Sequence, residues 1–426
     1  QVTDPVGHAI VFSYSDGKLS FIQDWSGRTV AYGYDESGNL SSVVDVNGNQ
    51  ILYGYNTENL LNQIRDQRNI NVLQNTYDTI GRVISQQDGN GNTTTFQYHT
   101  PDINSTTIIN ALNKSSVHVH NSKFQQIQIV DELSHTVSFG YDPIHGLKNS
   151  IIDKNGNQIQ YEYDERGNVT RTLYPDNSDV VITYNTLDLP IQQKDQLNQI
   201  TIWDYDSNGN VISETNPAGG VRYWTYNAFG QKLTETDFKG SVTTYSYDSN
   251  GLLISVTDAD GVTVQYAYDS LWRRISEKDG RNNITTYEYN SDDTIKKISK
   301  SLGFIAYTYD AVGNKLSETD FMNQVTSYQY DNNSNLIKTI LPGILGSAEY
   351  QYDALNRKIS TKDFRGKIWT FGYFDNGKLA QETTPDGQTT SYTYDNSGNL
   401  LIITDPTGRK ITQEYDNLNR KICEKN

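Results

Sequence analysis

Polar and apolar residues alternate along short segments of the chain, and each segment ends in a pair of aromatic residues. In QIQYEY (158–163), Ile159, Tyr161 and Tyr163 share one side of an extended strand, and the intervening Gln and Glu residues share the other. The segment 262–268 (VTVQYAY) repeats the pattern. A period of two predicts β-strands. No stretch shows a sustained helical period with capping residues, so the sequence predicts an all-β protein.

Two turn signals separate these strands. The first follows the aromatic pair, as in 35–39 (DESGN), and the second follows ten residues later, as in 45–49 (DVNGN). Asp accepts hydrogen bonds from the backbone two residues on, and Gly or Asn tolerates the positive φ of a tight turn. Each unit is therefore predicted to be one antiparallel β-hairpin.

The same unit recurs along the whole chain. The second aromatic residue of the pair can be followed through 20 positions that lie 20 to 22 residues apart. These positions are Tyr14, Tyr34, Tyr55, Tyr77, Tyr98, His120, Tyr141, Tyr163, Tyr184, Tyr205, Tyr226, Tyr247, Tyr268, Tyr289, Tyr309, Tyr330, Tyr352, Tyr373, Tyr394 and Tyr415. The pattern predicts one array of about 20 repeats over residues 1–426, incomplete at both ends and most degenerate at 99–140.

The return strand of each hairpin departs from simple alternation. Leu233 and Glu235 are two residues apart and so would share a face, and the same holds for the equivalent pairs that begin at Ile275 and Leu316. A β-bulge after the turn would reconcile this pattern, although the sequence does not show one. We expect the tyrosines of neighbouring units to stack into ladders, each aromatic pair adding about 0.5–1.5 kcal/mol.

The number of strands constrains the overall shape. About forty strands spaced by roughly 4.8 Å would form a flat ribbon about 190 Å wide. Open twisted sheets rarely exceed about 10 strands without curling. The ribbon is therefore expected to wind into a spiral, a large barrel or a shell, and the chain has too few bulky apolar residues to fill its inside. The predicted fold is a continuous antiparallel hairpin ribbon that spirals into a hollow shell or tube.

Charge and composition exclude several classes. The net charge is −16, which argues against nucleic acid as a partner. No run reaches the ~18 apolar residues that a membrane-spanning segment needs. The first residues, QVTDPVGHAI, lack an initiator Met and a signal peptide, so a processed or excised end is expected. Cys423 is the only cysteine, which leaves a packing role or an intermolecular bridge.

Candidate metal ligands occupy ordinary repeat positions. His118 and His120 would share a strand face, yet they stand where other repeats carry tyrosines, and His99 stands in an Asp position. We therefore favour substitution within the repeat over a metal site. The runs of alternating Asp and Asn at 45–49, 88–92 and 153–157 resemble the start of a calcium loop, but the Gly, Glu and helices of an EF-hand are missing.

The chain shows no recognised catalytic motif. It has no Gly-x-Ser-x-Gly, no P-loop and no His-Glu-x-x-His. Glycosylation sequons at Asn92, Asn104, Asn113, Asn168 and Asn283 are expected to be incidental. We predict no catalytic residue, no cofactor-binding residue, no metal ligand and no cofactor.

The repeat resembles the YD-repeat (RHS-repeat) family. The resemblance rests on Tyr-Asp-x-x-Gly-Asn followed by Thr-Asp-x-x-Gly, as in 205–211 (YDSNGNV) and 404–408 (TDPTG), and it covers nearly the whole chain. It implies a β-hairpin ribbon that spirals into a hollow cocoon. In bacterial RHS proteins and insecticidal toxin complex C components this shell encloses a toxic C-terminal segment, and in teneurins it belongs to an extracellular adhesion ectodomain.

One departure from the toxin-bearing members concerns Asp405. In those members an Asp-Pro-x-Gly motif lies in a segment whose aspartates cut the chain from its cargo. Asp405 begins such a motif here, but it occupies an ordinary second-turn position, as does Asp4. We therefore interpret Asp405 as a turn residue. Repeats continue after residue 408, with no cleavage segment or toxin domain, so the chain is interpreted as a segment of a longer array.

Three function classes remain open from sequence. The first is a non-catalytic shell that encloses or presents another polypeptide, and the second is an extracellular adhesion or filament-forming surface protein that binds partners or glycans. An enzyme, self-cleaving or glycan-active, is the least favoured. The expected partners are further repeats or domains of the same protein, an enclosed C-terminal polypeptide, identical neighbouring chains, or a cell-surface protein or glycan. The expected location is secreted or at the cell surface.

Overall fold

The computed structural model describes residues 1–4, 7–343 and 346–426, and these residues form 41 strands and no helix. The strands of the first half are β1 (Val2–Thr3), β2 (Ala9–Ser15), β3 (Lys18–Gln23), β4 (Thr29–Tyr34), β5 (Leu40–Val44), β6 (Gln50–Tyr55), β7 (Leu61–Arg65), β8 (Asn71–Tyr77), β9 (Val83–Asp88), β10 (Thr93–Tyr98), β11 (Ser105–Ile109), β12 (Ser115–His120), β13 (Gln126–Val130), β14 (Thr136–Tyr141), β15 (Lys148–Ile152), β16 (Gln158–Tyr163), β17 (Val169–Leu173), β18 (Asp179–Tyr184), β19 (Pro190–Lys194), β20 (Ile200–Tyr205) and β21 (Val211–Thr215). Those of the second half are β22 (Val221–Tyr226), β23 (Lys232–Thr236), β24 (Val242–Tyr247), β25 (Leu253–Thr257), β26 (Thr263–Tyr268), β27 (Arg274–Lys278), β28 (Ile284–Tyr289), β29 (Ile295–Lys300), β30 (Gly303–Tyr309), β31 (Lys315–Thr319), β32 (Val325–Tyr330), β33 (Leu336–Ile340), β34 (Ser347–Tyr352), β35 (Lys358–Lys362), β36 (Ile368–Tyr373), β37 (Leu379–Thr383), β38 (Thr389–Tyr394), β39 (Leu400–Thr404), β40 (Lys410–Tyr415) and β41 (Lys421–Lys425).

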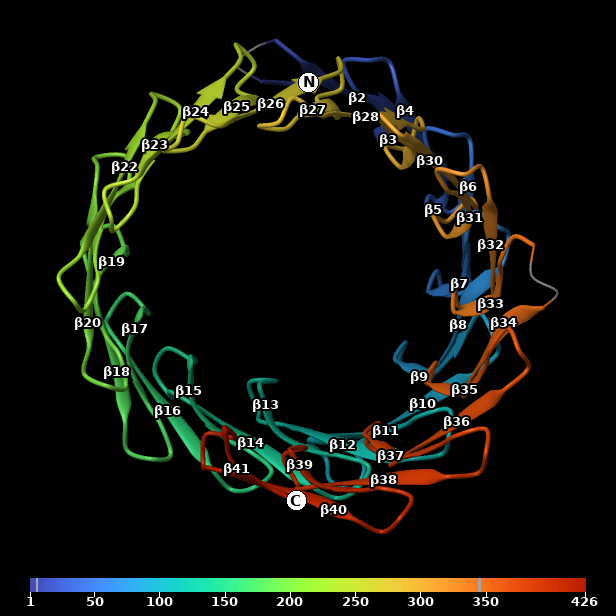
Figure 1. Cartoon of the computed structure of the whole chain (residues 1–426). Helices are drawn as coiled ribbons and strands as arrows, with labels where there is room; N and C mark the ends of the chain where they lie inside the picture. Colours follow the sequence, from blue (N-terminus) through green and yellow to red (C-terminus); the bar gives the residue numbers. More distant parts are fainter. Residues whose placement is uncertain (5–6, 344–345) are drawn as a thin grey trace.

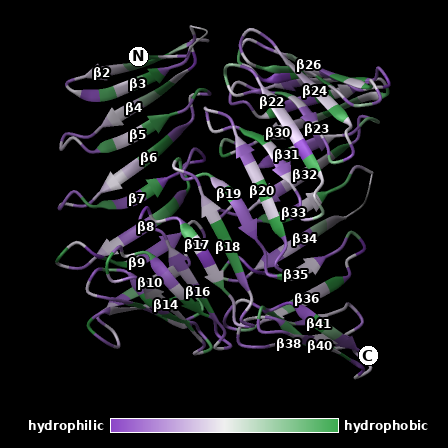
Figure 2. Cartoon of the chain, turned by 90° about the vertical axis from the view of Figure 1, so that its left-hand side faces the viewer, coloured by the Kyte–Doolittle hydropathy of each residue, from purple (hydrophilic) through white to green (hydrophobic). Residues whose placement is uncertain are grey.

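The strands form a single antiparallel sheet in which each strand pairs with the next one along the chain, as β26 does with β27 and β27 with β28. The ribbon winds into a ring around an open centre (Figure 1). From the N-terminus it passes β8, β14 and β20, returns past its starting point at β26, and runs over the same side again at β30–β36. Figure 2 shows the two passes side by side along the axis of the ring. The predicted all-β hollow spiral is confirmed.

The turns are built as the sequence predicted. In the loop after β20, Asp206 Oδ1 accepts hydrogen bonds from the backbone N–H groups of Asn208 and Asn210, both at 2.9 Å. Asp206 Oδ2 accepts a further bond of 2.8 Å from Asn210 Nδ2, and Gly209 adopts a φ of 86°. These bonds, led by the one from the Asn210 side chain, hold the pKa of Asp206 below its ordinary value. The Asp-x-x-Gly-Asn signature is therefore a turn that satisfies its own polar groups.

A β-bulge follows the aromatic pair in nearly every repeat. Tyr268 pairs with Arg274 and Ala267 pairs with Ser276, so Ile275 has no partner of its own. Leu233 and Leu316 occupy the same unpaired position in their repeats. The extra residue shifts the alternation, which places Glu277 opposite Tyr266 while Ile275 stays 36% exposed. The bulge thus explains how Leu or Ile and Glu, two residues apart, avoid sharing a face.

A tyrosine hydroxyl links most repeats to the one before. The Tyr268 hydroxyl donates a 2.8 Å hydrogen bond to the backbone carbonyl of Leu253, which is the residue that pairs with Tyr247 across the preceding bulge. Sixteen tyrosines make this bond: Tyr34, Tyr55, Tyr77, Tyr98, Tyr141, Tyr163, Tyr184, Tyr205, Tyr226, Tyr247, Tyr268, Tyr289, Tyr309, Tyr330, Tyr352 and Tyr373. Burial raises the pKa of the Tyr268 hydroxyl, which keeps it protonated and able to donate.

Direct ring stacking between repeats, which the sequence led us to expect, is not what links them. Basic side chains from the bulge stand between successive rings instead. The Lys315 ammonium lies 5.4 Å from the ring centre of Tyr307 and 4.9 Å from that of Tyr328, and Arg274 bridges Tyr266 and Tyr287 in the same way. The bulge places the basic residue on the aromatic face, so cation–π contacts replace ring–ring contacts there.

The ribbon has almost no conventional core. Among the described residues, Ala348 is the only buried hydrophobic residue, with 4% of its surface exposed. A single-layer sheet leaves both faces in contact with solvent, so burial of large side chains contributes less here than in a two-layer domain. Backbone pairing, the turn aspartates and the tyrosine bonds must supply a correspondingly larger share of the stability.

We predict that Tyr268→Phe lowers the free energy of unfolding by about 0.5–1.5 kcal/mol, because it removes one hydrogen bond and leaves the Leu253 carbonyl without its donor. Urea denaturation followed by circular dichroism measures the change. Tyr14→Phe is the matched control, because Tyr14 is 65% exposed at the beginning of the ribbon, and a change within about 0.5 kcal/mol is expected. Equal effects of the two substitutions would contradict the role of the tyrosine bond.

Candidate functional site: the seam and the central opening

The two edges of the ribbon carry different loops. The Tyr-side loops follow the aromatic pair, as in 35–39 and 206–210, and the return-side loops follow the returning strand, as in 45–49 and 405–409. Because neighbouring strands run in opposite directions, all Tyr-side loops lie along one edge and all return-side loops along the other. The ribbon therefore has two chemically distinct edges.

The two passes of the ribbon meet along a seam of opposite loop types. Asn47 Nδ2 donates a 2.8 Å hydrogen bond to Asp292 Oδ2, across 245 residues of sequence. Asn90 and Asn155 occupy the same loop position as Asn47 and donate to the first residue of a Tyr-side loop, Asn90 to Asp331 over 241 residues and Asn155 to Asp395 over 240 residues. This spacing corresponds to about eleven and a half repeats. Pairs at a longer separation also cross the seam. Loop 24–28 contacts Ser270 through Trp25 and Asp293 through Arg28, so one return-side loop of the first pass meets two neighbouring Tyr-side loops of the second.

Charged side chains also cross the seam. Arg28 Nη1 lies 2.7 Å from Asp293 Oδ1, and Lys114 Nζ lies 3.0 Å from Asp375 Oδ2. These side chains are between 25% and 50% exposed, so each pair contributes no more than about 1 kcal/mol. Their importance lies in their repetition along the seam rather than in any one pair.

An aromatic cluster joins the two passes where the seam begins. The rings of Trp25 and Trp272 are centred 5.1 Å apart, and His8 lies 4.9 Å from the first and 4.7 Å from the second. Trp25 Nε1 donates a 2.9 Å hydrogen bond to the carbonyl of Ser270. Aromatic pairs of this kind contribute about 0.5–1.5 kcal/mol beyond burial. The cluster is therefore a strong local contact within an otherwise polar seam.

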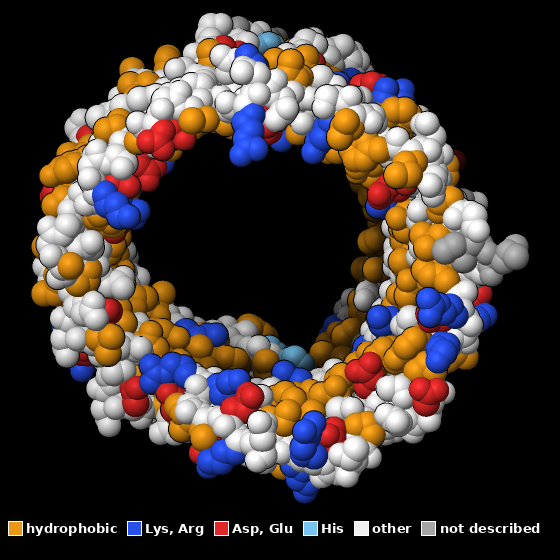
Figure 3. All heavy atoms as spheres, viewed as in Figure 1, with side chains coloured by type: hydrophobic (Ala, Val, Ile, Leu, Met, Phe, Trp, Pro, Cys, Tyr) orange, Lys and Arg blue, Asp and Glu red, His pale blue; other side chains and the backbone are white. Residues whose placement is uncertain are grey.

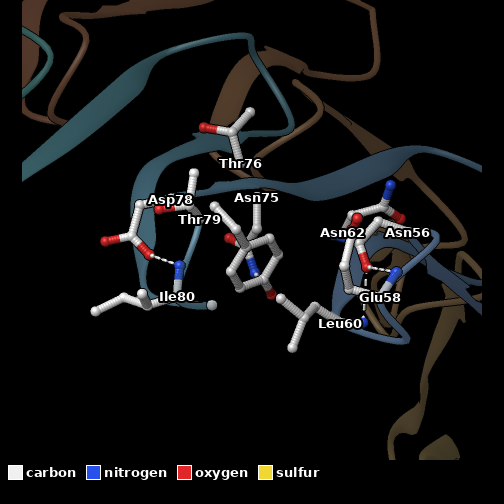
Figure 4. A pocket seen from close by; sticks show the side chains of 11 residues that line it. Asn56, Glu58, Leu60, Asn62, Asn75, Thr76, Asp78, Thr79 and Ile80 are labelled. Atoms are coloured by element: carbon white, nitrogen blue, oxygen red, sulfur yellow. Dashed lines mark hydrogen bonds between the residues drawn. The ribbon is translucent and has the colours of Figure 1, made fainter.

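A hollow of about 650 Å³ lies between two Tyr-side loops near β8. Figure 4 shows that its polar groups already serve their own turns: Asn56 Oδ1 accepts the N–H groups of Glu58 and Leu60, and Asp78 Oδ1 accepts that of Ile80. Its floor is Asn75, which stands where most repeats carry the first aromatic residue. The hollow is thus explained by a missing ring, and no nucleophile–base pair converges on it.

Asp405 lies in an ordinary return-side turn. Its Oδ1 accepts hydrogen bonds from the backbone and the hydroxyl of Thr407, at 2.9 and 2.6 Å, and its Oδ2 lies 3.1 Å from Arg409 Nε. These contacts, led by the Thr407 hydroxyl, hold the pKa of Asp405 below its ordinary value. An ionised, turn-capping carboxylate is the arrangement expected of a structural residue.

The residues considered from sequence as candidate metal ligands, and set aside there, are likewise engaged in local contacts. Asp45 Oδ1 accepts the backbone N–H groups of Asn47 and Asn49, so the calcium-like run is a turn. His118 Nδ1 lies 2.7 Å from Gln126 Nε2, and burial lowers the pKa of His118. Within the described ranges, no three His, Cys, Asp or Glu residues are grouped so that they could hold a metal ion. Independence from metals stays a prediction.

A central opening runs through the ring (Figure 3). Figure 3 shows a continuous hole through the ring, bordered by hydrophobic side chains and by acidic and basic side chains of both signs. Charged side chains border the hole where β22–β25 lie, and hydrophobic ones are prominent on the opposite side.

The described part of the chain contains no helix with the length and apolar character to cross a bilayer.

Two family models match the sequence. Residues 122–303 match the model of the teneurin YD-shell, and residues 373–410 match that of the RHS repeat. These matches confirm the resemblance of the repeat to the YD-repeat (RHS-repeat) family. No curated protein matches the sequence.

The fold resembles solved shells of toxin complexes. The crystal structure of TcdB2-TccC3 without its hypervariable C-terminal region aligns with a TM-score of 0.78 at 16% identity, over 98% of this chain and 27% of that one. The crystal structure of TcdB2-TccC3-TEV gives 0.75 at 17% over the same shares, and a Tc holotoxin pore of Photorhabdus luminescens gives 0.73 at 17%. At these identities the likeness shows the fold, and this chain spans about a quarter of the length of those structures.

We predict that the seam loosens in acid. Burial acts to raise the pKa of Asp292, Asp88 and Asp153, but hydrogen bonds from neighbouring side chains and backbone groups hold all three below the ordinary value of 3.8. A carboxyl group whose pKa is lower in the folded state than in the unfolded state stabilises the fold at pH values above its unfolded-state pKa. This stabilisation is lost as the pH falls through the lowered folded-state pKa. Hydrogen exchange in loops 45–49 and 88–92 should therefore accelerate below about pH 3.8 relative to the intrinsic rate.

A triple variant, Asn47→Asp with Asn90→Asp and Asn155→Asp, should expose the same loops already at neutral pH. It places a carboxylate against Asp292, Asp331 and Asp395, and like charges in contact repel. Asn208→Asp is the matched control: Asn208 precedes a turn glycine in the same way but lies in a loop outside the seam. Unchanged protection in the triple variant would show that these three bonds do not hold the seam.

Proposed function

We propose that the chain is a non-catalytic wall segment of a secreted or cell-surface YD-repeat protein, and that its ring encloses or presents another polypeptide. The observation that carries the proposal is the open centre of the ring, which the ribbon surrounds with a wall only one sheet thick. A structure stabilised by backbone pairing and turn aspartates, with almost no buried hydrophobic residues, can surround a space without filling it.

The chemistry of the inner boundary supports an extended polypeptide as the contents. Hydrophobic, acidic and basic side chains all border the opening, so no single ligand type is selected. A small-molecule enzyme would need a few convergent polar groups in a closed pocket. The hollow near β8 is lined by groups that already serve their own turns, and this favours a container over a catalyst.

The comparisons support the same proposal at the level of the fold. The structural neighbours are shells of TcdB2-TccC3 complexes, one of which is described as lacking its hypervariable C-terminal region, and the teneurin YD-shell model covers 122–303. The resemblance to this family also supports the extracellular setting. The sequence identities are low, so the binding partners of those proteins are not assigned to particular residues of this chain.

Protease protection tests the enclosure. An unstructured polypeptide with one protease site, attached after Asn426, should be cleaved more slowly on the intact ring than on the triple seam variant Asn47→Asp, Asn90→Asp, Asn155→Asp. The same polypeptide free in solution, mixed with the intact ring, sets the unprotected rate. Equal cleavage rates for the intact fusion, the seam-variant fusion and the free polypeptide would refute the proposal that the ring encloses a polypeptide.

A further inference from the structure

The asparagines that bond across the seam are each followed by glycine. The sequence Asn-Gly occurs at 47–48, 90–91 and 155–156, always at the third and fourth positions of a return-side loop. The side chains of all three asparagines reach the second pass, and all three residues are exposed to solvent. Their bonds are those of Asn47 to Asp292 at 2.8 Å, Asn90 to Asp331 at 2.9 Å and Asn155 to Asp395 at 3.0 Å.

An asparagine that precedes glycine is prone to lose its side-chain amide, because glycine has no Cβ to hinder the approach of its backbone nitrogen. In the seam, the nitrogen of Gly48 attacks Cγ of Asn47. The new N–Cγ bond closes a succinimide ring, the Cγ–Nδ2 bond breaks, and ammonia leaves with the proton of the Gly48 N–H group. Water then adds to one ring carbonyl and reopens the ring as aspartate or isoaspartate. The reaction consumes one water, releases one ammonia and involves no oxidation or reduction.

The closed seam opposes this reaction at both reacting groups. The Asn47 amide is held at its two ends, since Nδ2 donates to Asp292 and Oδ1 accepts the hydroxyl of Ser291. The Gly48 N–H group donates a 3.0 Å hydrogen bond to the carbonyl of Asp45 inside the turn. Ring closure therefore requires the loop to leave both its partner and its turn, so the rate depends on how often the seam opens.

Asn208 provides the comparison within the chain. Its backbone N–H lies 2.9 Å from Asp206 Oδ1, the same distance as that of Asn47 from Asp45 Oδ1. Gly209 N–H donates to the Asp206 carbonyl at 3.1 Å, and Asn208 is exposed. Within the part of the chain that the structure describes, however, its side-chain amide makes no hydrogen bond to the other pass. The two sites thus share a turn and differ in the bond across the seam.

We propose that Asn47, Asn90 and Asn155 are deamidation sites through which the seam opens irreversibly. Each conversion replaces an amide donor by a carboxylate that faces an aspartate of the other pass, and like charges in contact repel. Isoaspartate also lengthens the main chain by one methylene inside a turn whose N–H groups converge on a single carboxylate. The inference rests on the seam and does not depend on the proposed function, because the seam opens whether or not the ring has contents.

Ageing of the full chain at mildly alkaline pH tests the proposal. Peptide mapping by mass spectrometry measures conversion at the three seam asparagines and at Asn208, and hydrogen exchange measures the protection of loops 45–49 and 88–92 in the same samples. We expect the seam asparagines to convert about 10- to 100-fold more slowly than Asn208, because the opening breaks a hydrogen bond to a charged group. Protection of the two loops should fall in proportion to conversion at the seam.

Two glutamine variants separate deamidation from other effects of ageing. The triple variant Asn47→Gln, Asn90→Gln, Asn155→Gln keeps an amide at each position, but glutamine would have to close a less favourable six-membered ring. Its loops should keep, after ageing, the protection that the same variant has before ageing. Asn208→Gln is the matched control, and its seam loops should lose protection as those of the wild type do.

Three results would overturn the proposal. One is conversion of the seam asparagines with full protection of both loops. Another is loss of protection on ageing in the triple glutamine variant to the same extent as in the wild type. The third is the absence of conversion at the seam after ageing well beyond about 100 times the period that Asn208 needs, because one hydrogen bond to a charged group slows the reaction by no more than that. Equal rates at the seam and at Asn208 would overturn the claim that the closed seam protects its asparagines.

Discussion

The hydrogen bond from a tyrosine hydroxyl to the carbonyl beside the preceding bulge is the interaction on which the ribbon depends. In a two-layer domain, side chains from a second layer hold a hairpin in place, but this sheet has no second layer, and Ala348 is its one buried hydrophobic residue among those described. The bond of Tyr268 to Leu253, found in sixteen of the repeats, gives those hairpins a fixed side-chain contact with their predecessors. The bulge supplies the geometry, and it also brings Lys315 and Arg274 onto the aromatic face.

Because the ribbon of hairpins curves, it closes into a ring-shaped wall (Figure 1). The repeats bend steadily enough that the ribbon meets itself 240–266 residues further along the chain, where each pass contacts loops of the other. The Asn–Asp bonds, the ion pairs such as Arg28 with Asp293 and the tryptophan cluster therefore stabilise one particular circumference.

The local structure could be predicted from sequence because its causes are local. The Asp206 turn, the alternation in 158–163 and the period of about 21 residues each follow from neighbours in the chain, and the structure confirms the hairpins they predicted. The bulge at Ile275 could be suspected from the spacing to Glu277 but needed the pairing register to be seen. The expectation of stacked rings was wrong in its chemistry, because the sequence alone did not show Lys315 between Tyr307 and Tyr328.

The seam could not be predicted, because the number of repeats in a turn depends on small bends summed over many hairpins. Asn47 and Asp292 both sit in ordinary loop positions, and nothing near either residue marks the other as its partner. The shape that results, a one-sheet wall around an open centre, is the central claim. Small-angle X-ray scattering, measured on a monomeric fraction isolated by gel filtration, tests it most directly. We expect a pair-distance distribution of a hollow ring, with a wall about 10 Å thick, as one sheet requires. A distribution of a filled globule or of a flat, open ribbon would contradict the account.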